Sequence, residues 1–195
     1  MFDVRKISVV AAVVVSFLTA PAWAENLVGK KAPEFSLVDQ TGKTHKLSDY
    51  AGKTVVLEWT NPGCPFVVRH YEVGTMKRLA EASASDNVVW LAVNSSHFTT
   101  AKESTDWATK HGHGFVTLHD PDGKVGKAYG AVTTPHMYVV DGKGMVAYEG
   151  AIDSDAWVKD PKATNYVAAA LADLKAGRSV SQSYVKPYGC SVKYK

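Results

Sequence analysis

Short apolar runs alternate with segments of helical periodicity along most of the chain. Runs of about four to eight apolar residues bounded by turn residues are typical of buried strands, whereas apolar residues spaced three and four apart indicate helices. The pattern predicts a β-hairpin, then alternating strands and helices, then a second hairpin and a last helix. The expected strands are residues 35–38, 44–47, 54–59, 87–94, 115–118, 136–141 and 145–150, and the expected helices are residues 64–83, 99–110, 124–129 and 165–176.

The order of these elements predicts the fold class. A strand, a helix and another strand over residues 54–94 form a unit whose strands are parallel and whose crossover is right-handed. The turn at residues 141–144, Asp-Gly-Lys-Gly, predicts an antiparallel pair at the other end. We therefore expect an α/β domain with a mixed central sheet.

Residues 1–24 have the pattern of a signal peptide. Arg5 and Lys6 precede an apolar stretch over residues 7–20, and Ala22-Trp23-Ala24 matches a cleavage site. The stretch is shorter than the roughly 20 residues that span a bilayer, so we expect cleavage after Ala24 rather than an anchor. The mature protein would be periplasmic or secreted, with a domain over residues 25–177 and a C-terminal arm over residues 178–195. No other segment is apolar and long enough to predict a membrane span.

Charge and composition give no indication of nucleic-acid, metal or cofactor binding. A net charge of +3 with scattered lysines is too mild to indicate nucleic-acid binding. His111 and His113 form only a pair with no third ligand nearby, so we expect no metal site. The sequence predicts no cofactor.

The chemistry is expected at the turn between strand 54–59 and the helix that follows it. Asn61-Pro62-Gly63 is a turn sequence, and Cys64 is followed by Pro65, which is tolerated in a first helical turn. Free N–H groups and the helix dipole stabilise a thiolate at such a position, which lowers the pKa of the cysteine. We therefore expect Cys64 to be a reactive sulfur with one open face. Thr60 and Asn61 could donate hydrogen bonds to an incoming oxygen.

Cys190 is the only other cysteine. Two cysteines in an exported protein of this size can form a redox pair or one structural bridge, or they can remain unpaired thiols. We hypothesise that the arm folds back so that Cys190 meets Cys64, within one chain or between two chains.

Two other side chains are candidates near this site. Glu58 lies in an otherwise apolar strand; if it points inward, burial raises the pKa of its carboxyl and it could relay protons, but it could also pair with a lysine. His136 follows Pro135 and is either a base on the cysteine face or an ordinary strand-edge residue.

Several motifs occur in a fixed order. G-K-K-A-P-E-F-S-L-V-D-Q-T-G-K precedes L-S-D-Y-A-G-K-T-V-V-L, the strand leads to Cys64-Pro65, Thr134-Pro135 precedes a strand that ends in D-G-K-G, and the chain closes with P-Y-G-C-S-V-K-Y. The chain resembles the thioredoxin superfamily, in particular its exported peroxiredoxin-like, AhpC/TSA or redoxin branch, from about Gly29 to Tyr194. The resemblance implies a thioredoxin-like three-layer sandwich with an N-terminal β-hairpin, and a cis-proline at Pro135 that faces the active-site cysteine.

The chain also departs from the patterns of these families. Asn61 stands where the first cysteine of the thioredoxin C-x-x-C pair would be, so a local dithiol cannot form. Thr60 lies four residues before Cys64 rather than three, so the peroxiredoxin pattern is incomplete, and Arg69 is only the nearest candidate for the peroxide-directing arginine.

The resemblance implies a thiol-dependent oxidoreductase. Cys64 would be the redox nucleophile and Cys190 the resolving or bridging partner, with a peroxide or a protein thiol or disulfide as substrate and an external thiol as reductant. One alternative is a non-catalytic binding module with a structural disulfide. Another is a copper-binding assembly factor. Its C-x-x-x-C-P motif is reduced here to Cys64, with His136 as a candidate second ligand, because Thr60 occupies the first cysteine position.

Overall fold

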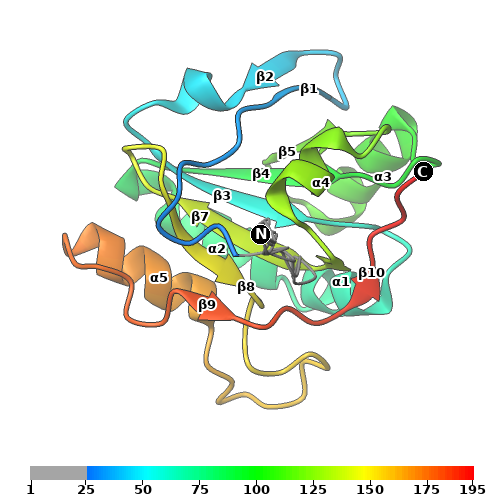
Figure 1. The fold of residues 1–195 in the computed structure, drawn as a ribbon. Helices are drawn as coiled ribbons and strands as arrows, with labels where there is room; N and C mark the ends of the chain where they lie inside the picture. Colours follow the sequence, from blue (N-terminus) through cyan, green and yellow to red (C-terminus); the bar gives the residue numbers. More distant parts are fainter. Residues whose placement is uncertain (1–25) are drawn as a thin grey trace, which may run out of the picture.

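The computed structural model describes residues 26–195, so the expected signal peptide lies outside the described residues. The remaining chain is an α/β domain built on a twisted sheet (Figure 1). The strands are β1 Ser36–Asp39, β2 Thr44–Lys46, β3 Thr54–Trp59, β4 Val88–Asn94, β5 Val116–His119, β6 Thr133–Thr134, β7 His136–Val140, β8 Val146–Gly150, β9 Tyr184–Val185 and β10 Cys190–Ser191. The helices are α1 Pro65–Glu72, α2 Thr75–Ser83, α3 Ala101–His111, α4 Lys124–Tyr129 and α5 Tyr166–Lys175, with 3₁₀ turns η1 Leu47–Tyr50 and η2 Ala84–Asp86.

The main sheet is mixed, as the sequence predicts. Its strand order is β2-β1-β5-β4-β3-β7-β8-β9, with β3, β4 and β5 parallel and β3, β7 and β8 antiparallel. The N-terminal hairpin β1–β2 continues the sheet through an antiparallel pair between β1 and β5. Helices connect the parallel strands, because parallel neighbours need a crossover.

Side-chain alternation along the buried strands separates two cores. In β3, Val56 belongs to the core that also contains Cys64, whereas Leu57 and Trp59 belong to the core on the other face. The first core is closed by residues of α1, α2, α3 and α5, and the second by the hairpin, η1 and α4. Position along β3 therefore determines which side chains can approach Cys64.

The expected helix over residues 64–83 is two helices. Gly74 has φ of 70°, in the left-handed region that glycine adopts at little cost, and it separates α1 from α2. Val73, the residue before this break, is turned outward, and 44% of its surface is exposed.

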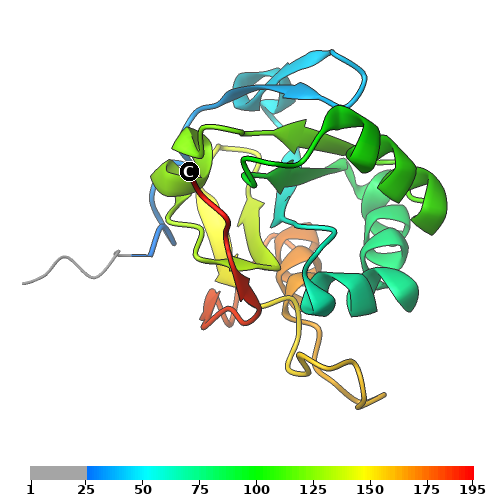
Figure 2. The same cartoon turned by 90° about the vertical axis from the view of Figure 1, so that its right-hand side faces the viewer.

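The C-terminal arm, residues 178–195, packs on the domain. Strand β9 joins the edge of the main sheet beside β8, and β10 pairs antiparallel with β6 in a small second sheet. Figure 2 shows the end of the arm, in red, crossing this side of the molecule. The approach is close at Gly189, where a methyl group would collide with the carbonyl oxygen of Thr134.

Between residues 26 and 195, none of the helices has both the length and the apolar character needed to cross a bilayer.

Candidate active site

The turn after β3 presents Cys64 at the start of a helix. The Asn61 side-chain oxygen accepts a hydrogen bond from Gly63 N at 2.8 Å, and the Asn61 carbonyl accepts one from Cys64 N at 2.9 Å. Cys64 is the N-cap of α1 and Pro65 is in the first turn, as the sequence predicts. The Asn61 amide donates to Ser96 Oγ at 3.0 Å, and Asn61 is 5% exposed. In this structure the Asn61 oxygen is used within the turn and its amide is used on Ser96, and a hydrogen bond from Asn61 to a substrate stays a prediction.

The arm brings Cys190 to Cys64. Their sulfur atoms lie 2.8 Å apart, and both cysteines are free thiols. In the β10–β6 pair Cys190 lies opposite Thr134, whose carbonyl oxygen is 3.0 Å from the Cys64 sulfur. The Thr134–Pro135 peptide bond is cis, as the resemblance implies. Thus one short strand, β6, places both sulfurs at one point.

The two thiols are electrostatically unequal. Burial raises the pKa of Cys64, but contacts with the Cys190 thiol, with Thr134 and with the backbone N–H groups of Val67 and Cys190 together lower it below its ordinary value. The pKa of Cys190 is raised to about 11 by burial and by the neighbouring Cys64. Because hydrogen bonds to the charged form favour ionisation, Cys64 loses its proton first.

Access to the sulfurs differs from the expectation. Cys64 is only 1% exposed, so the prediction of an open face is wrong. It packs in a core with Val67, Met137 and the partly exposed Cys190. The arm, far away in sequence, supplies this cover, which the residues around Cys64 do not indicate.

Glu58 points inward, on the same face of β3 as Val56. It is fully buried, and Trp90 Nε1 donates to its Oε2 at 3.0 Å. Burial raises the pKa of Glu58 to about 7, opposed by contacts with Trp90, Tyr71 and Thr60. Thr60 is 2% exposed and lies beside this carboxyl, and a hydrogen bond from it to an incoming oxygen stays a prediction.

His136 is placed away from the cysteines. It pairs across β7 and β3 with Trp59, and its ring contacts Tyr138, so it lies on the face opposite Cys64. Burial lowers the pKa of His136 to about 3. The interpretation of His136 as a base for Cys64 is not supported, and neither is a copper site made of these two residues. Among residues 26–195, no group of three or more His, Cys, Asp and Glu side chains is arranged to hold a metal ion.

Sequence reasoning missed a buried polar group beneath the arm. In a single unbroken helix His70 would be expected at the surface. It is instead fully buried against Tyr188 and Asp153. Arg69 on the same helix lies with its guanidinium over the Trp157 ring, 4.6 Å from the centroid. The sequence feature that pointed to such a group is Tyr188, two positions before Cys190. If the arm packs on the domain, the hydroxyl of this tyrosine needs a hydrogen-bond partner there.

Comparisons with known proteins show which proteins this chain resembles. A model of the AhpC/TSA family matches residues 28–149. Thiol-disulfide oxidoreductase ResA of Geobacillus thermodenitrificans is 33% identical over 119 residues, which are 61% of this chain and 66% of that protein. A Mycobacterium tuberculosis protein whose name proposes it as a peroxiredoxin is 28% identical over 155 residues, covering 75% of this chain and 93% of that protein. The crystal structure of an uncharacterized conserved protein from Geobacillus kaustophilus superposes with a TM-score of 0.80 at 28% identity, covering 88% of this chain and 94% of that one.

Proposed function

Since the chain belongs to the AhpC/TSA family and has the thioredoxin-like α/β fold, we propose that it is a thiol-dependent oxidoreductase that works through Cys64 and Cys190. The observation that carries the proposal is the 2.8 Å between the two sulfurs, which come from positions 126 residues apart. A cysteine pair brought together by a dedicated strand replaces the local C-x-x-C pair that the chain lacks.

The reaction that this arrangement supports best is thiol–disulfide exchange. The Cys64 thiolate attacks a substrate disulfide, which forms a mixed disulfide and releases one substrate thiolate. Cys190, once deprotonated, attacks the Cys64 sulfur, which forms the Cys64–Cys190 disulfide and releases the second substrate thiolate. The substrate gains two electrons, and an external dithiol returns them to the protein. Relatives named as thiol-disulfide oxidoreductases support exchange as the class of reaction.

Cys64 also has features that favour a peroxide as substrate. Helix N–H groups stabilise its thiolate, and a second thiol lies in contact with it. A peroxide would convert Cys64 to a sulfenic acid and release an alcohol or water, and Cys190 would then form the disulfide with loss of water. In both reactions the arm must move to admit the substrate, because Cys64 is 1% exposed.

Glu58 is the proposed proton carrier. A carboxyl with a pKa of about 7 can bind or release a proton near neutral pH. It lies on the Cys64 face of the sheet, so we assign it the proton that Cys190 loses before it attacks the Cys64 sulfur. Thr60 belongs to the polar surroundings of this carboxyl.

The signal-peptide pattern of residues 1–24 supports the proposal that this chemistry takes place outside the cytoplasm. Disulfides persist in that oxidising environment. The proposal thus includes export, a protein thiol or disulfide as substrate, and an external thiol as reductant.

Stoichiometric oxidation tests the proposal. The reduced protein is treated separately with one equivalent of a disulfide-bonded peptide and of hydrogen peroxide, and the products are mapped by peptide mass spectrometry. We expect at least one oxidant to form the Cys64–Cys190 disulfide in the wild-type protein. The Cys190→Ser variant should carry a trapped adduct on Cys64, and the Cys64→Ser variant should carry no such adduct. A wild-type protein that neither oxidant changes would instead indicate the non-catalytic module.

A further inference from the structure

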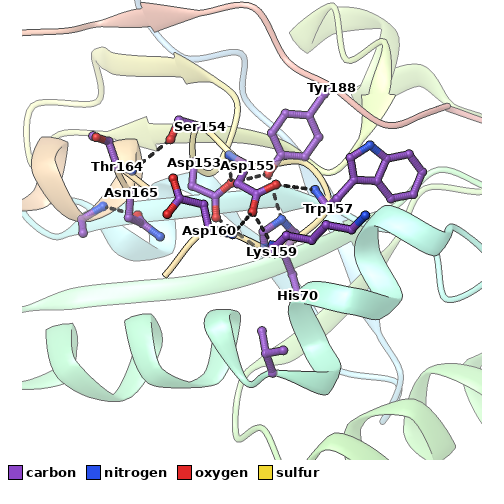
Figure 3. Close-up of polar contacts among 12 residues, drawn as sticks. His70, Asp153, Ser154, Asp155, Trp157, Lys159, Asp160, Thr164, Asn165 and Tyr188 are labelled. Carbon is purple, nitrogen blue, oxygen red and sulfur yellow. Dashed lines mark hydrogen bonds and ion pairs between the residues drawn. The ribbon is translucent and has the colours of Figure 1, made fainter. Parts of the chain in front are cut away.

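Tyr188, two residues before Cys190, ties the arm to the domain. Its hydroxyl donates a hydrogen bond to Asp153 Oδ1 at 2.7 Å and lies 2.8 Å from His70 Nε2 (Figure 3). Its ring also packs against the rings of His70 and Phe66. His70 and Phe66 belong to α1, the helix that Cys64 begins. The same tyrosine therefore connects the segment that carries one cysteine to the helix that carries the other.

The loop over residues 151–165 holds Asp153 in place. Asp153 Oδ1 accepts a further hydrogen bond from Asp155 N, and residue 153 forms a β-bridge with Asn165. The Asp155 carboxylate in turn accepts hydrogen bonds from the backbone of Trp157, Lys159 and Asp160, as Figure 3 shows. Val158 in this loop has φ of 55°, a left-handed conformation that is strained for a β-branched residue. Such strain persists only where the surroundings over-determine it.

The proton positions in this group follow from its geometry. Asp153 is an acceptor when ionised, so the Tyr188 hydroxyl gives its hydrogen to Asp153 and accepts one from His70 Nε2. His70 is then neutral, with Nδ1 unprotonated and 3.8 Å from Asp153 Oδ2. Burial lowers the pKa of His70, which keeps this neutral form at pH 7. The chain of donors thus runs from α1 through the arm to the loop and ends on a carboxylate.

We propose that Tyr188, held by Asp153 and His70, is a positioning residue that docks the arm and so sets the effective concentration of Cys190 at Cys64. The inference rests on the proposed function only because it assumes that Cys64 and Cys190 form a reversible disulfide. When the latch (Tyr188, Asp153 and His70) is weakened, the reduced arm can lift away, but the oxidised arm is held by the disulfide and cannot. Weakening it therefore disfavours the disulfide and exposes Cys64 in the reduced protein.

Tyr188→Phe tests the latch, because it removes the hydroxyl and keeps the ring. The matched control is Tyr184→Phe, an exposed arm tyrosine in β9 whose hydroxyl makes no hydrogen bond within residues 26–195. One readout is the equilibrium of the Cys64–Cys190 pair against a glutathione buffer. The other is the rate at which iodoacetamide modifies Cys64 in the reduced protein, resolved by peptide mass.

We expect Tyr188→Phe to lower the disulfide equilibrium constant about tenfold, since a charge-assisted hydrogen bond is lost, and so to raise the reduction potential by about 30 mV. Cys64 modification should accelerate by a similar factor, while Tyr184→Phe matches the wild type. Asp153→Asn carries the same test if Tyr188→Phe does not fold. Equal values for the latch variants and Tyr184→Phe on both readouts would overturn the proposal. A wild-type pair that forms no reversible disulfide would contradict the proposed function instead, and the modification rate would still decide the role of Tyr188.

Discussion

Cys190 lies directly opposite Thr134 in the antiparallel pair of β10 and β6, and the Thr134 carbonyl oxygen is 3.0 Å from the Cys64 sulfur. The register of one short strand pair therefore determines the distance between the two cysteines. Side chains in a strand alternate between faces, so a slip by one residue would turn Cys190 away from Cys64. This dependence on a single local pairing makes the site sensitive to small changes in the arm.

Substitution of Gly189 should release the arm. Gly189 has φ of 131°, and a methyl group there would collide with the Thr134 carbonyl oxygen. Strain of about 1–3 kcal/mol would shift the docked arm toward an open form by roughly fivefold or more. We expect Gly189→Ala to accelerate iodoacetamide modification of Cys64 by at least that factor in the reduced protein.

Gly114→Ala is the matched control for this prediction. A methyl group at Gly114 meets no atom within 4 Å, and its φ is not in the left-handed region. This variant should modify at the wild-type rate and retain the wild-type far-UV circular dichroism. A Gly189→Ala protein that is folded and as slow to react as Gly114→Ala would contradict the role of the arm as a cover.

An external thiol should attack the Cys64–Cys190 disulfide at Cys190. Cys190 is the more exposed cysteine, and Cys64, whose thiol has the lower pKa, is the better leaving group. Oxidised protein mixed briefly with a small thiol and quenched with acid should carry the mixed disulfide on Cys190, as mapped by tandem mass spectrometry. Adducts found mainly on Cys64 would show that the external thiol attacks the Cys64 sulfur instead.

Replacement of Glu58 should stabilise the protein at high pH. Because burial raises the pKa of Glu58 to about 7, the folded state binds more protons than the unfolded state above the ordinary carboxyl pKa. Stability contributed by the wild-type residue is therefore lost as the pH rises from about 4.5 to 7. Glu58→Gln removes that loss, and we expect it to gain on the order of 2–3 kcal/mol relative to wild type at pH 8 and little at pH 4.

Urea unfolding at the two pH values measures this difference. The same variant should lose the inflection near pH 7 in the rate of disulfide formation, because the proton acceptor is gone. Equal stability differences at pH 4 and pH 8 would mean that the Glu58 carboxyl is not neutral in the folded protein.

Local patterns predicted the scaffold of the site well. The apolar run of β3, the Asn61-Pro62-Gly63 turn and the Cys64-Pro65 helix start all depend on neighbouring residues, and the structure has each of them where expected. The prediction of a single helix over residues 64–83 is wrong at Gly74, where the chain breaks into two helices. A single glycine disfavours a helix only weakly, so its presence does not show whether the helix continues or ends.

The side chains around the sulfur were harder to predict, because tertiary contacts decide them. Burial of Cys64 and His70 depends on the arm, which follows them by more than a hundred residues. The face of His136 depends on its register opposite Trp59 in a neighbouring strand. Three tyrosines and a cysteine within residues 178–195 indicated a packed arm, but not the strand to which it pairs.

The reduction potential of the Cys64–Cys190 pair tests the central claim most directly. It is measured in the wild-type protein by equilibration with dithiol and glutathione buffers and mass analysis of the alkylated thiols. The proposed exchange chemistry predicts a value above about −300 mV, in the range where external thiols reduce the pair. A value below about −300 mV, typical of structural disulfides, would mean that the bond only fastens the arm and that Cys64 does not act as a redox nucleophile.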